Sequence, residues 1–507
     1  MGASESTPAK ASTEEEDLFT SDELETLHAA FAAFCKFSDG GGSIHVDALL
    51  RAGALPPALP WAALLELMRA LDDPGAAGAA AAVGWPGFVR GVARCCKGPK
   101  GARRRALVGL YASSAGRLGA DGARALLRDS LAAARAGGAD AAGAASAAFA
   151  APLADALAGA DGAPPAVAAD DFAAWAGAQL PALSSCLDAH LLALLRAIGG
   201  AADAKAAAAA AAPAAAMSAV HEPLLEGAAG QAEERALLRG EGAWLLALAL
   251  GDAAPGEARA WRCLYASAAH GLSLNRFVHH TAGYSGPTLL VVATDRGELL
   301  GAHIDAPLKP SDAYFGGAGC FLFSLAPNFH VYRPTGLAKN FAFFNPPLTG
   351  TMRGAHYGAA SAAPQALAFG GQTSRFRLAL EDDLNTCRYH TSCTTYRAHG
   401  GGGGAAAAGA DAEGARRVVG VELWGCGGVE AAEAQRRVRE RNARDLGRAR
   451  HFDTKLMFGA GPGWKDEAQR DADVDKFILE TAGAHTFYGD RLQDVEEEQR
   501  TMARAPR

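Results

Sequence analysis

The pattern of apolar and polar positions divides the chain into a helical part and a strand-rich part. Between residues 21 and 200, apolar side chains recur at the three- and four-residue spacing of amphipathic helices, beginning with Leu24, Leu27 and Phe31. Ser21 is placed to cap this first helix. Further helices are expected over Trp61–Leu71, Phe88–Cys95, Ala102–Leu118, Asp121–Ala134 and Leu187–Ile198.

From Trp261 to Pro346, aromatic and β-branched runs broken by Gly, Pro and Asn replace the helical spacing. Leu289–Val292 and Leu299–Ile304 flank an Asp-Arg-Gly turn, which predicts a β-hairpin. A second pair, Cys320–Leu325 and Phe329–Tyr332, flanks a Pro-Asn break. The sequence therefore predicts an α+β protein in which a helical domain precedes an antiparallel sheet.

One loop of the helical part has the outline of an EF-hand without its ligands. Gly42 and Ile44 stand where such a loop has its tight turn and its short strand. With Ile44 at position eight, the ligand positions one, three, five and twelve hold Phe37, Asp39, Gly41 and Ala48. A second loop, Asp72–Phe88, offers only Asp72 and Asp73. We expect neither loop to bind calcium; an EF-hand-like helix pair without metal could still hold a peptide in a groove.

Alanine- and glycine-rich stretches separate these parts, at residues 135–170, 199–235 and 400–408, and predict linkers or mobile insertions. The expected organisation is a disordered tail over residues 1–20, an EF-hand-like helical domain over 21–200, an alanine-rich linker over 201–238, a strand-rich domain over 239–428 and a helical extension over 429–507.

Composition narrows the classes of function. The chain of 507 residues has a formal net charge of −7, which gives no field that would attract nucleic acid. Nine scattered cysteines with no secretory signal favour a reducing, cytoplasmic setting. The apolar segment Ala243–Leu250 is too short to span a bilayer, and Ala201–Val220 is interrupted by charge and proline.

Candidate catalytic and metal-binding residues are few. Cys387, His390 and Cys393 have a zinc-like spacing but lack a fourth ligand. His303 with Asp305, and the pair His279–His280, also lack partners at an informative spacing, which favours surface or satisfied core histidines. No nucleophile elbow, P-loop or dinucleotide-binding motif stands in a suitable context. We therefore expect no catalytic residues, no metal and no cofactor, and a protein that is not an enzyme.

Many short blocks of the strand-rich part resemble, in order and spacing, the TLDc domain. The blocks are Trp261–Tyr265, His270–Phe277, Gly286–Leu290, Leu300–Ala302, Lys309–Asp312, Phe315–Gly316, Cys320–Leu325, Phe369–Gly371, Arg377–Leu384, Ser392–Tyr396 and Val421–Gly425. The resemblance covers roughly residues 245–428 and implies a β-sandwich with flanking helices. Within it, Cys393 belongs to a block of the sandwich, which favours packing over zinc binding.

The overall plan is most similar to the myristoylated, mTOR-associated TLDc proteins of the EAK type. Met1-Gly2 followed by Ser6 fits the N-myristoylation pattern, so the resemblance implies lipidation of Gly2. One acyl chain gives only reversible membrane binding, and acidic residues 14–17 would repel anionic lipid. Residence on a membrane would then depend partly on a protein partner.

By this resemblance the expected partners are subunits of the vacuolar-type H⁺-ATPase, with a link to the TOR complex and to oxidative-stress resistance. The expected location is cytoplasmic, at the periphery of a lysosome, a vacuole or another endomembrane. A direct antioxidant protein is the alternative, and it would require an exposed thiol of low pKa. Cys320 and Cys263 lie in strand-like or aromatic surroundings that are typical of buried, inert thiols.

After Gly428 the chain becomes basic and then amphipathic. Glu430–His451 carries seven arginines and predicts an exposed helix. Val474, Phe477 and Ile478 recur at helical spacing and predict a short docking helix, which either packs on the chain's own sandwich or binds a partner groove. The sequence as a whole favours a non-enzymatic adaptor.

Overall fold

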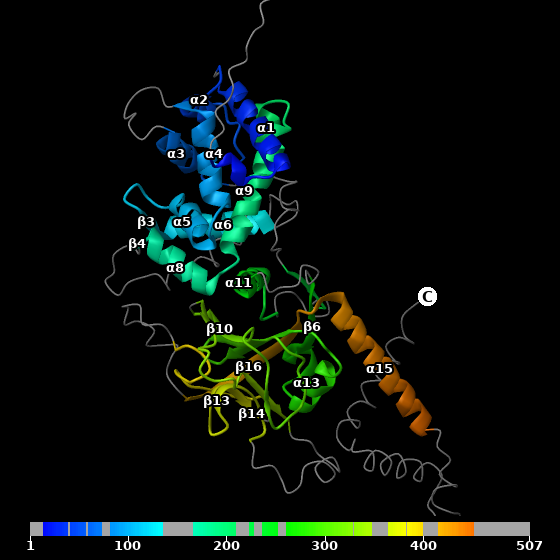
Figure 1. Ribbon diagram of the computed structural model, residues 1–507. Helices are drawn as coiled ribbons and strands as arrows, with labels where there is room; N and C mark the ends of the chain where they lie inside the picture. The colour runs from blue at the N-terminus through cyan, green and yellow to red at the C-terminus, as the bar shows by residue number, and fades with distance from the viewer. Residues whose placement is uncertain are drawn as a thin grey trace, which may run out of the picture. The chain divides into compact units, whose positions relative to one another are not determined.

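The computed structural model describes residues 14–38, 41–56, 59–72, 82–134, 166–208, 223–227, 236–251, 260–327, 329–346, 364–381, 383–398 and 414–450. The chain forms two compact units (Figure 1). Unit 1 contains Met1–Glu222 and Gly240–Gly256, and unit 2 contains Pro223–Arg239 and Glu257–Arg507. Among the described residues, no single helix is long and apolar enough to cross a membrane.

Unit 1 is helical. Its longer helices are α1 (Ser21–Phe37), α3 (Trp61–Asp72), α4 (Trp85–Cys96), α5 (Lys100–Gly109), α6 (Ala120–Ala134), α8 (Ala169–Gln179), α9 (Leu183–Gly199) and α11 (Gly240–Leu250). The shorter ones are η1 (Glu16–Leu18), α2 (Val46–Arg51) and α10 (Ala204–Ala208). Helix α1 packs on α9, α3 on α4, and α5 on α8. The core between them holds Phe34, Phe88, Phe172 and Trp244, all fully buried.

Two very short sheets join the helices of unit 1 in pairs. Strand β1 (Ile44–His45) pairs antiparallel with β2 (Ala82–Val83), and β3 (Arg117–Gly119) pairs antiparallel with β4 (Ala166–Ala168). The predicted strand position of Ile44 is confirmed, and its register partner is Val83.

Asp72, a candidate ligand of the second predicted loop, supports the start of a helix. Its carboxylate accepts hydrogen bonds from the backbone N–H groups of Gly84 at 2.6 Å and Gly87 at 2.9 Å. Such an acceptor satisfies N–H groups that have no partner within the first turn of α4.

Two local predictions in unit 1 are wrong in detail. The residue that caps α1 is Thr20 rather than Ser21: Thr20 Oγ1 accepts from the N–H of Glu23, and Glu23 accepts from the N–H of Thr20. The helix expected up to Leu118 ends at Gly109. The chain turns at Gly116, whose φ of +69° suits glycine, and Leu118 belongs to β3.

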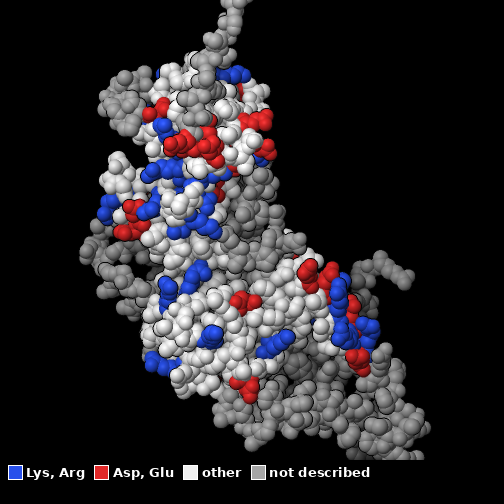
Figure 2. Space-filling model, viewed as in Figure 1, with Lys and Arg blue, Asp and Glu red and all other residues white. Residues whose placement is uncertain are grey.

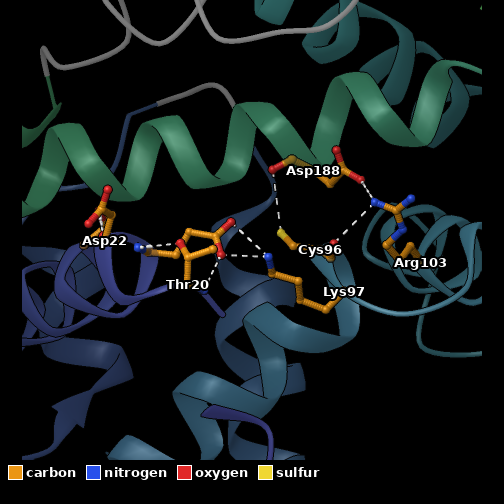
Figure 3. A network of polar contacts seen from close by, with 8 residues as sticks. Thr20, Asp22, Cys96, Lys97, Arg103 and Asp188 are labelled. Carbon is orange, nitrogen blue, oxygen red and sulfur yellow. Dashed lines mark hydrogen bonds and ion pairs between the residues drawn. The ribbon is translucent and has the colours of Figure 1, made fainter. Parts of the chain in front are cut away.

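A polar network ties several helices of unit 1 together (Figure 3). Arg103 at the start of α5 forms an ion pair with the buried Asp188 of α9 and also donates to the carbonyl oxygen of Cys96 at 3.3 Å. Beside it, Lys97 Nζ lies 2.8 Å from the carboxylate of Glu23 on α1. The network therefore links α1, α5 and α9 to the end of α4.

Unit 2 is built around a large, mainly antiparallel sheet. Its strands are β5 (Leu224–Glu226), β6 (Ala260–Ala266), β7 (Thr288–Thr294), β8 (Leu299–Ile304), β9 (Tyr314–Phe315), β10 (Phe321–Ala326), β11 (His330–Tyr332), β12 (Ala342–Asn345), β13 (Ala366–Gln372), β14 (Arg375–Glu381), β15 (Thr386–Tyr389) and β16 (Gly414–Gly425). The main path runs β11-β10-β8-β7-β16-β15-β14-β13-β12-β9, with β6 also on β16 and β5 parallel to β6. Both predicted hairpins, β7–β8 and β10–β11, are confirmed.

Strand β16 joins the two halves of this sheet. Its first residues pair with β15, and its later residues pair with β6 and β7. One core contains Leu290 and Leu322 from the first half together with Leu367 and Leu380 from the second. The two halves therefore face each other across a shared apolar layer. The fold is α+β, as predicted.

Helices flank the sheet of unit 2: α12 (Ser267–His270), α13 (Leu274–Thr281) and α15 (Gly428–Arg450). The segment before the sheet is held by the buried Glu422 of β16, whose carboxylate accepts from the N–H groups of Leu237 at 2.8 Å and Leu238 at 3.1 Å. Glu422 also accepts from the indole of Trp424 at 2.9 Å. Residues 223–239 thus belong with the sheet, whereas α11 belongs to unit 1.

Candidate functional site

A buried ionic cluster lies where the two halves of the unit 2 sheet meet. Glu298, between β7 and β8, forms an ion pair with Arg416 of β16 at 3.7 Å, and their side chains are 6% and 5% exposed. The carboxylate also accepts from the hydroxyls of Tyr389 at 2.9 Å and Thr294 at 2.8 Å. Burial and the nearby Glu298 raise the pKa of Tyr389 to about 12, so its hydroxyl stays a donor.

A pocket of about 60 Å³ opens beside this cluster. Its wall comes from β8, β10 and β11 on one side and from β14 and β15 on the other. The lining residues are Glu298, Leu300, Gly301, Leu322, Phe323, Ser324, Ala326, Tyr332, Arg377, Leu378, Tyr389 and His390. Arg377 is buried, and its guanidinium lies 5.0 Å from the centre of the Tyr332 ring. The pocket thus combines apolar walls with a cation and several hydrogen-bonding groups.

The zinc-like trio of the sequence does not form a metal centre. The described residues contain no group of three or more His, Cys, Asp or Glu side chains that could hold a metal ion. Cys387 is buried in the core, and Cys393 packs against the same core, which confirms packing for Cys393. His390 lines the pocket instead.

The thiols are mostly buried. Cys320 is buried as expected, and burial raises its pKa to about 12. Cys263 is half-buried rather than buried, yet desolvation and Glu422 raise its pKa to about 12. Burial likewise raises the pKa of Cys95 and Cys387 to about 12. Thiols held protonated in this way are weak nucleophiles at neutral pH.

His303 and Asp305 organise a glycine-rich loop. The buried His303 stacks on Phe321, and its Nδ1 lies 2.9 Å from the carbonyl oxygen of Gly319. The interpretation of a satisfied core histidine is therefore confirmed. The carboxylate of Asp305 accepts from the N–H groups of Gly317 at 2.8 Å and Gly319 at 2.9 Å.

The pair His279–His280 has a partner that the spacing did not reveal. His270, at the end of α12, stacks on His280 with ring centres 3.8 Å apart. Burial, followed by the like charges of neighbouring histidines and arginines, lowers the pKa of His280 to about 3. His280 is therefore neutral at physiological pH.

The expected basic helix is present as α15, and its first turns are docked beside these histidines. Ala431 and Gln435 are buried, and Gln435 donates to the carbonyl oxygens of His280 at 2.9 Å and Ala282 at 3.3 Å. Arg439 donates to the same His280 oxygen at 2.9 Å. These donors satisfy carbonyl groups left open at the end of α13.

The remaining sequence-based candidates lie outside the described residues. These are Gly2 for lipidation and Val474, Phe477 and Ile478 for partner binding. The glycine–alanine run at residues 400–408 also lies outside them.

The pocket, the buried ionic cluster and every strand of the unit 2 sheet except β5 fall within one stretch that can be compared with known families. Residues 234–427 match the TLDc domain family. The TLDc domain therefore contains Glu298, Arg377, Tyr389 and Arg416, and α15 begins directly after it.

Curated relatives share part of this domain. The chain is 34% identical over 136 residues to oxidation resistance protein 1 of Xenopus tropicalis and 33% identical over 136 residues to that of Homo sapiens. It is 32% identical over 139 residues to nuclear receptor coactivator 7 of Gallus gallus. In each case the similarity covers 27% of this chain and 13% of the relative.

Proposed function

We propose that this chain is a non-enzymatic adaptor that contributes to oxidative-stress resistance by binding another protein. The names of the relatives support the link to oxidation resistance, since two of them are oxidation resistance protein 1. The raised pKa values of the thiols support an indirect contribution, in which the chain binds another protein and does not itself reduce peroxide. Peroxide reduction by a cysteine needs an accessible thiolate, whereas burial raises the pKa of Cys95, Cys263, Cys320 and Cys387 to about 12.

Helix α15 is the observation that carries the binding role. One face of its first turns is fixed on the TLDc domain by Ala431 and Gln435, while the following turns present charged side chains to solvent. Figure 2 shows basic and acidic side chains along α15, beside a sheet surface with only scattered charges. Residues 436–445 include five arginines and two acidic residues, so this surface favours a partner with an acidic face.

The partner that we propose is the vacuolar-type H⁺-ATPase, at a lysosome- or vacuole-like membrane, with a connection to the TOR complex. The choice of this partner rests on the similarity of the chain's domain organisation to that of the myristoylated EAK-type TLDc proteins. Lipidation of Gly2 would supply reversible membrane contact, and Val474, Phe477 and Ile478 would extend the docking surface beyond α15. In this proposal unit 1, with its two helix pairs joined by β1–β2 and β3–β4, is an EF-hand-like scaffold that binds peptide without calcium.

Affinity capture of proton-pump subunits tests the adaptor role. The full chain should recover them, and a chain ending at Gly428 should not. Charge reversal of the exposed face of α15 by Arg436→Glu with Arg441→Glu should reduce recovery several-fold, because like charges would then oppose the acidic partner. Arg417→Glu, at an exposed position of β16, is the matched control and should leave recovery unchanged. Equal recovery, or none, from the full and shortened chains would refute the proposal.

Cell fractionation tests the membrane step separately. Gly2→Ala should lower the membrane-bound share of the protein, because it removes the acyl acceptor. A Gly2→Ala protein that fractionates with membranes as the unaltered chain does would show that acylation is not the anchor.

A further inference from the structure

Residues 14–19, directly before α1, form a short strap that is held on unit 1 by its side chains. The strap contains the 3₁₀ turn η1, in which the N–H of Phe19 donates to the carbonyl oxygen of Glu16 at 3.1 Å. Phe19 is buried, whereas the neighbouring Leu18 is 54% exposed. The strap therefore turns one apolar side chain inward and leaves the next one in solvent.

Two carboxylates of the strap are matched to donors on α4. Glu16 accepts a hydrogen bond from the indole N–H of Trp85 at 2.6 Å. Glu15 forms an ion pair with Arg90, with 3.6 Å between Glu15 Oε1 and Arg90 Nε. The same guanidinium donates to the carbonyl oxygen of Leu71 at 3.0 Å, which holds it beside the strap. Helix α4 thus offers one cation and one hydrogen-bond donor to neighbouring acidic side chains.

Phe19 is the apolar anchor of the strap. Its side chain is 7% exposed, and the ammonium of Lys97, at the end of α4, lies 4.9 Å from the centre of its ring. Lys97 also pairs with Glu23 of α1 at 2.8 Å, which holds the ammonium beside the strap (Figure 3). A buried aromatic side chain surrounded by partly exposed polar contacts is the usual anchor of a recognition segment.

These contacts define a sequence pattern. An acidic pair at positions 15 and 16, followed three residues later by phenylalanine, meets a cation, an indole donor and an ammonium on α4. The contacts are made by side chains, so they depend on this pattern and not on the covalent link to α1. A segment of another protein with the same pattern fits the same surface, as acidic motifs fit basic clusters elsewhere.

We propose that Trp85, Arg90 and Lys97 form a peptide site for acidic segments of the pattern Glu-Glu-x-x-Phe, and that the chain's own strap occupies it. This inference rests on the proposed role of unit 1 as a peptide-binding scaffold, for which it names the site and the class of ligand. A tethered segment competes at an effective concentration of roughly millimolar. The strap is therefore autoinhibitory, and a partner segment binds by displacing it.

Fluorescence anisotropy with a labelled peptide of residues 14–20, Glu-Glu-Glu-Asp-Leu-Phe-Thr, tests this inference. The opened chain is the full-length protein with Glu15→Ala, Glu16→Ala and Phe19→Ala, and it keeps the Thr20 cap of α1. The peptide should bind the opened chain saturably and at least tenfold more tightly than the unaltered chain, because the strap no longer competes. A peptide with alanine in place of phenylalanine should bind the opened chain at least tenfold more weakly.

Variants of α4 locate the site. Trp85→Phe with Arg90→Gln, added to the opened chain, should weaken peptide binding at least tenfold, because both carboxylates lose their donors. The same two changes at Arg51 of α2 and Trp175 of α8 are the control and should leave binding unchanged. Circular dichroism and urea unfolding show whether each variant is folded. Binding that the changes on α4 leave intact would overturn this site without overturning the scaffold role.

Photocrosslinking of the unaltered chain gives a second measurement that needs no opened variant. The peptide with benzoylphenylalanine in place of phenylalanine, at millimolar concentration, should crosslink within residues 85–97, and excess unlabelled peptide should suppress this. Crosslinks confined to other regions, or absence of saturable binding to a folded opened chain, would overturn the inference. Capture of proton-pump subunits is a separate readout: if the unaltered chain recovers them but the folded opened chain binds no peptide, only this inference fails.

Discussion

Removal of Arg416 should destabilise the TLDc domain strongly. The Arg416→Met variant keeps most of the side chain's apolar volume but leaves the carboxylate of Glu298 buried without its counter-charge. Breaking a buried ion pair from one side costs about 3–5 kcal/mol. The hydroxyls of Tyr389 and Thr294 still donate to Glu298, so we expect about 3 kcal/mol, the lower end of this range.

Urea unfolding measures this cost, with hydrogen–deuterium exchange of peptides from β15 and β16 reporting on unit 2. Arg388→Met is the matched control, because the Arg388–Glu381 pair joins the same region but its side chains are 61% and 35% exposed. Exposed pairs contribute about 0–1 kcal/mol. The double variant Glu298→Gln with Arg416→Met should recover part of the loss, since no buried charge is left alone. Equal effects of Arg416→Met and Arg388→Met would refute this account of the cluster.

Three further predictions concern single side chains. Burial lowers the pKa of His190 from 6.5 to about 4, and neither ring nitrogen has a hydrogen-bond partner, so the unfolded state takes up the proton first as the pH falls. The free energy of unfolding of unit 1 should therefore fall by about 3 kcal/mol between pH 6.5 and pH 4. His190→Leu should abolish this loss in acid-unfolding curves. Identical acid-unfolding curves for His190→Leu and the unaltered chain would disprove this role of His190. Asp305→Ala should raise hydrogen exchange at the 316–320 loop, because two backbone N–H groups lose their acceptor. Asp312→Ala, at an exposed position, is the control and should leave the exchange unchanged. Equal exchange in the two variants would contradict the role of Asp305 in holding the loop. Asp72→Ala should lower the stability of unit 1 by about 1–2 kcal/mol in urea unfolding, as expected for a helix cap, and an unchanged midpoint would count against it.

Local sequence patterns predicted the elements but not the contacts between distant ones. The hairpin β7–β8 is set by a turn and two apolar runs within seventeen residues, and the strand at Ile44 by a short motif, so both could be predicted. The pairs Glu298–Arg416 and Arg103–Asp188 depend on the tertiary fold, which brings together residues far apart in the chain. The spacing of apolar residues within one segment does not show which distant residues will meet in the fold.

The same limit applies to the candidate site. Arg377 and Tyr389 stand in ordinary strand patterns. The pocket that they line forms only because the two halves of the sheet lie face to face. Cys393 illustrates the converse: its place in a short sequence block favoured packing over zinc binding, and its side chain packs against the core that contains Cys387.

Survival under peroxide of cells that lack their own TLDc protein tests the central claim most directly. The cells would carry the full chain, the chain ending at Gly428, or a full chain with Cys263→Ser and Cys393→Ser at its two half-buried thiols. The adaptor account predicts protection by the full chain and by the cysteine variant, and loss of protection on truncation. Protection that survives truncation but is lost with the two thiols would contradict it.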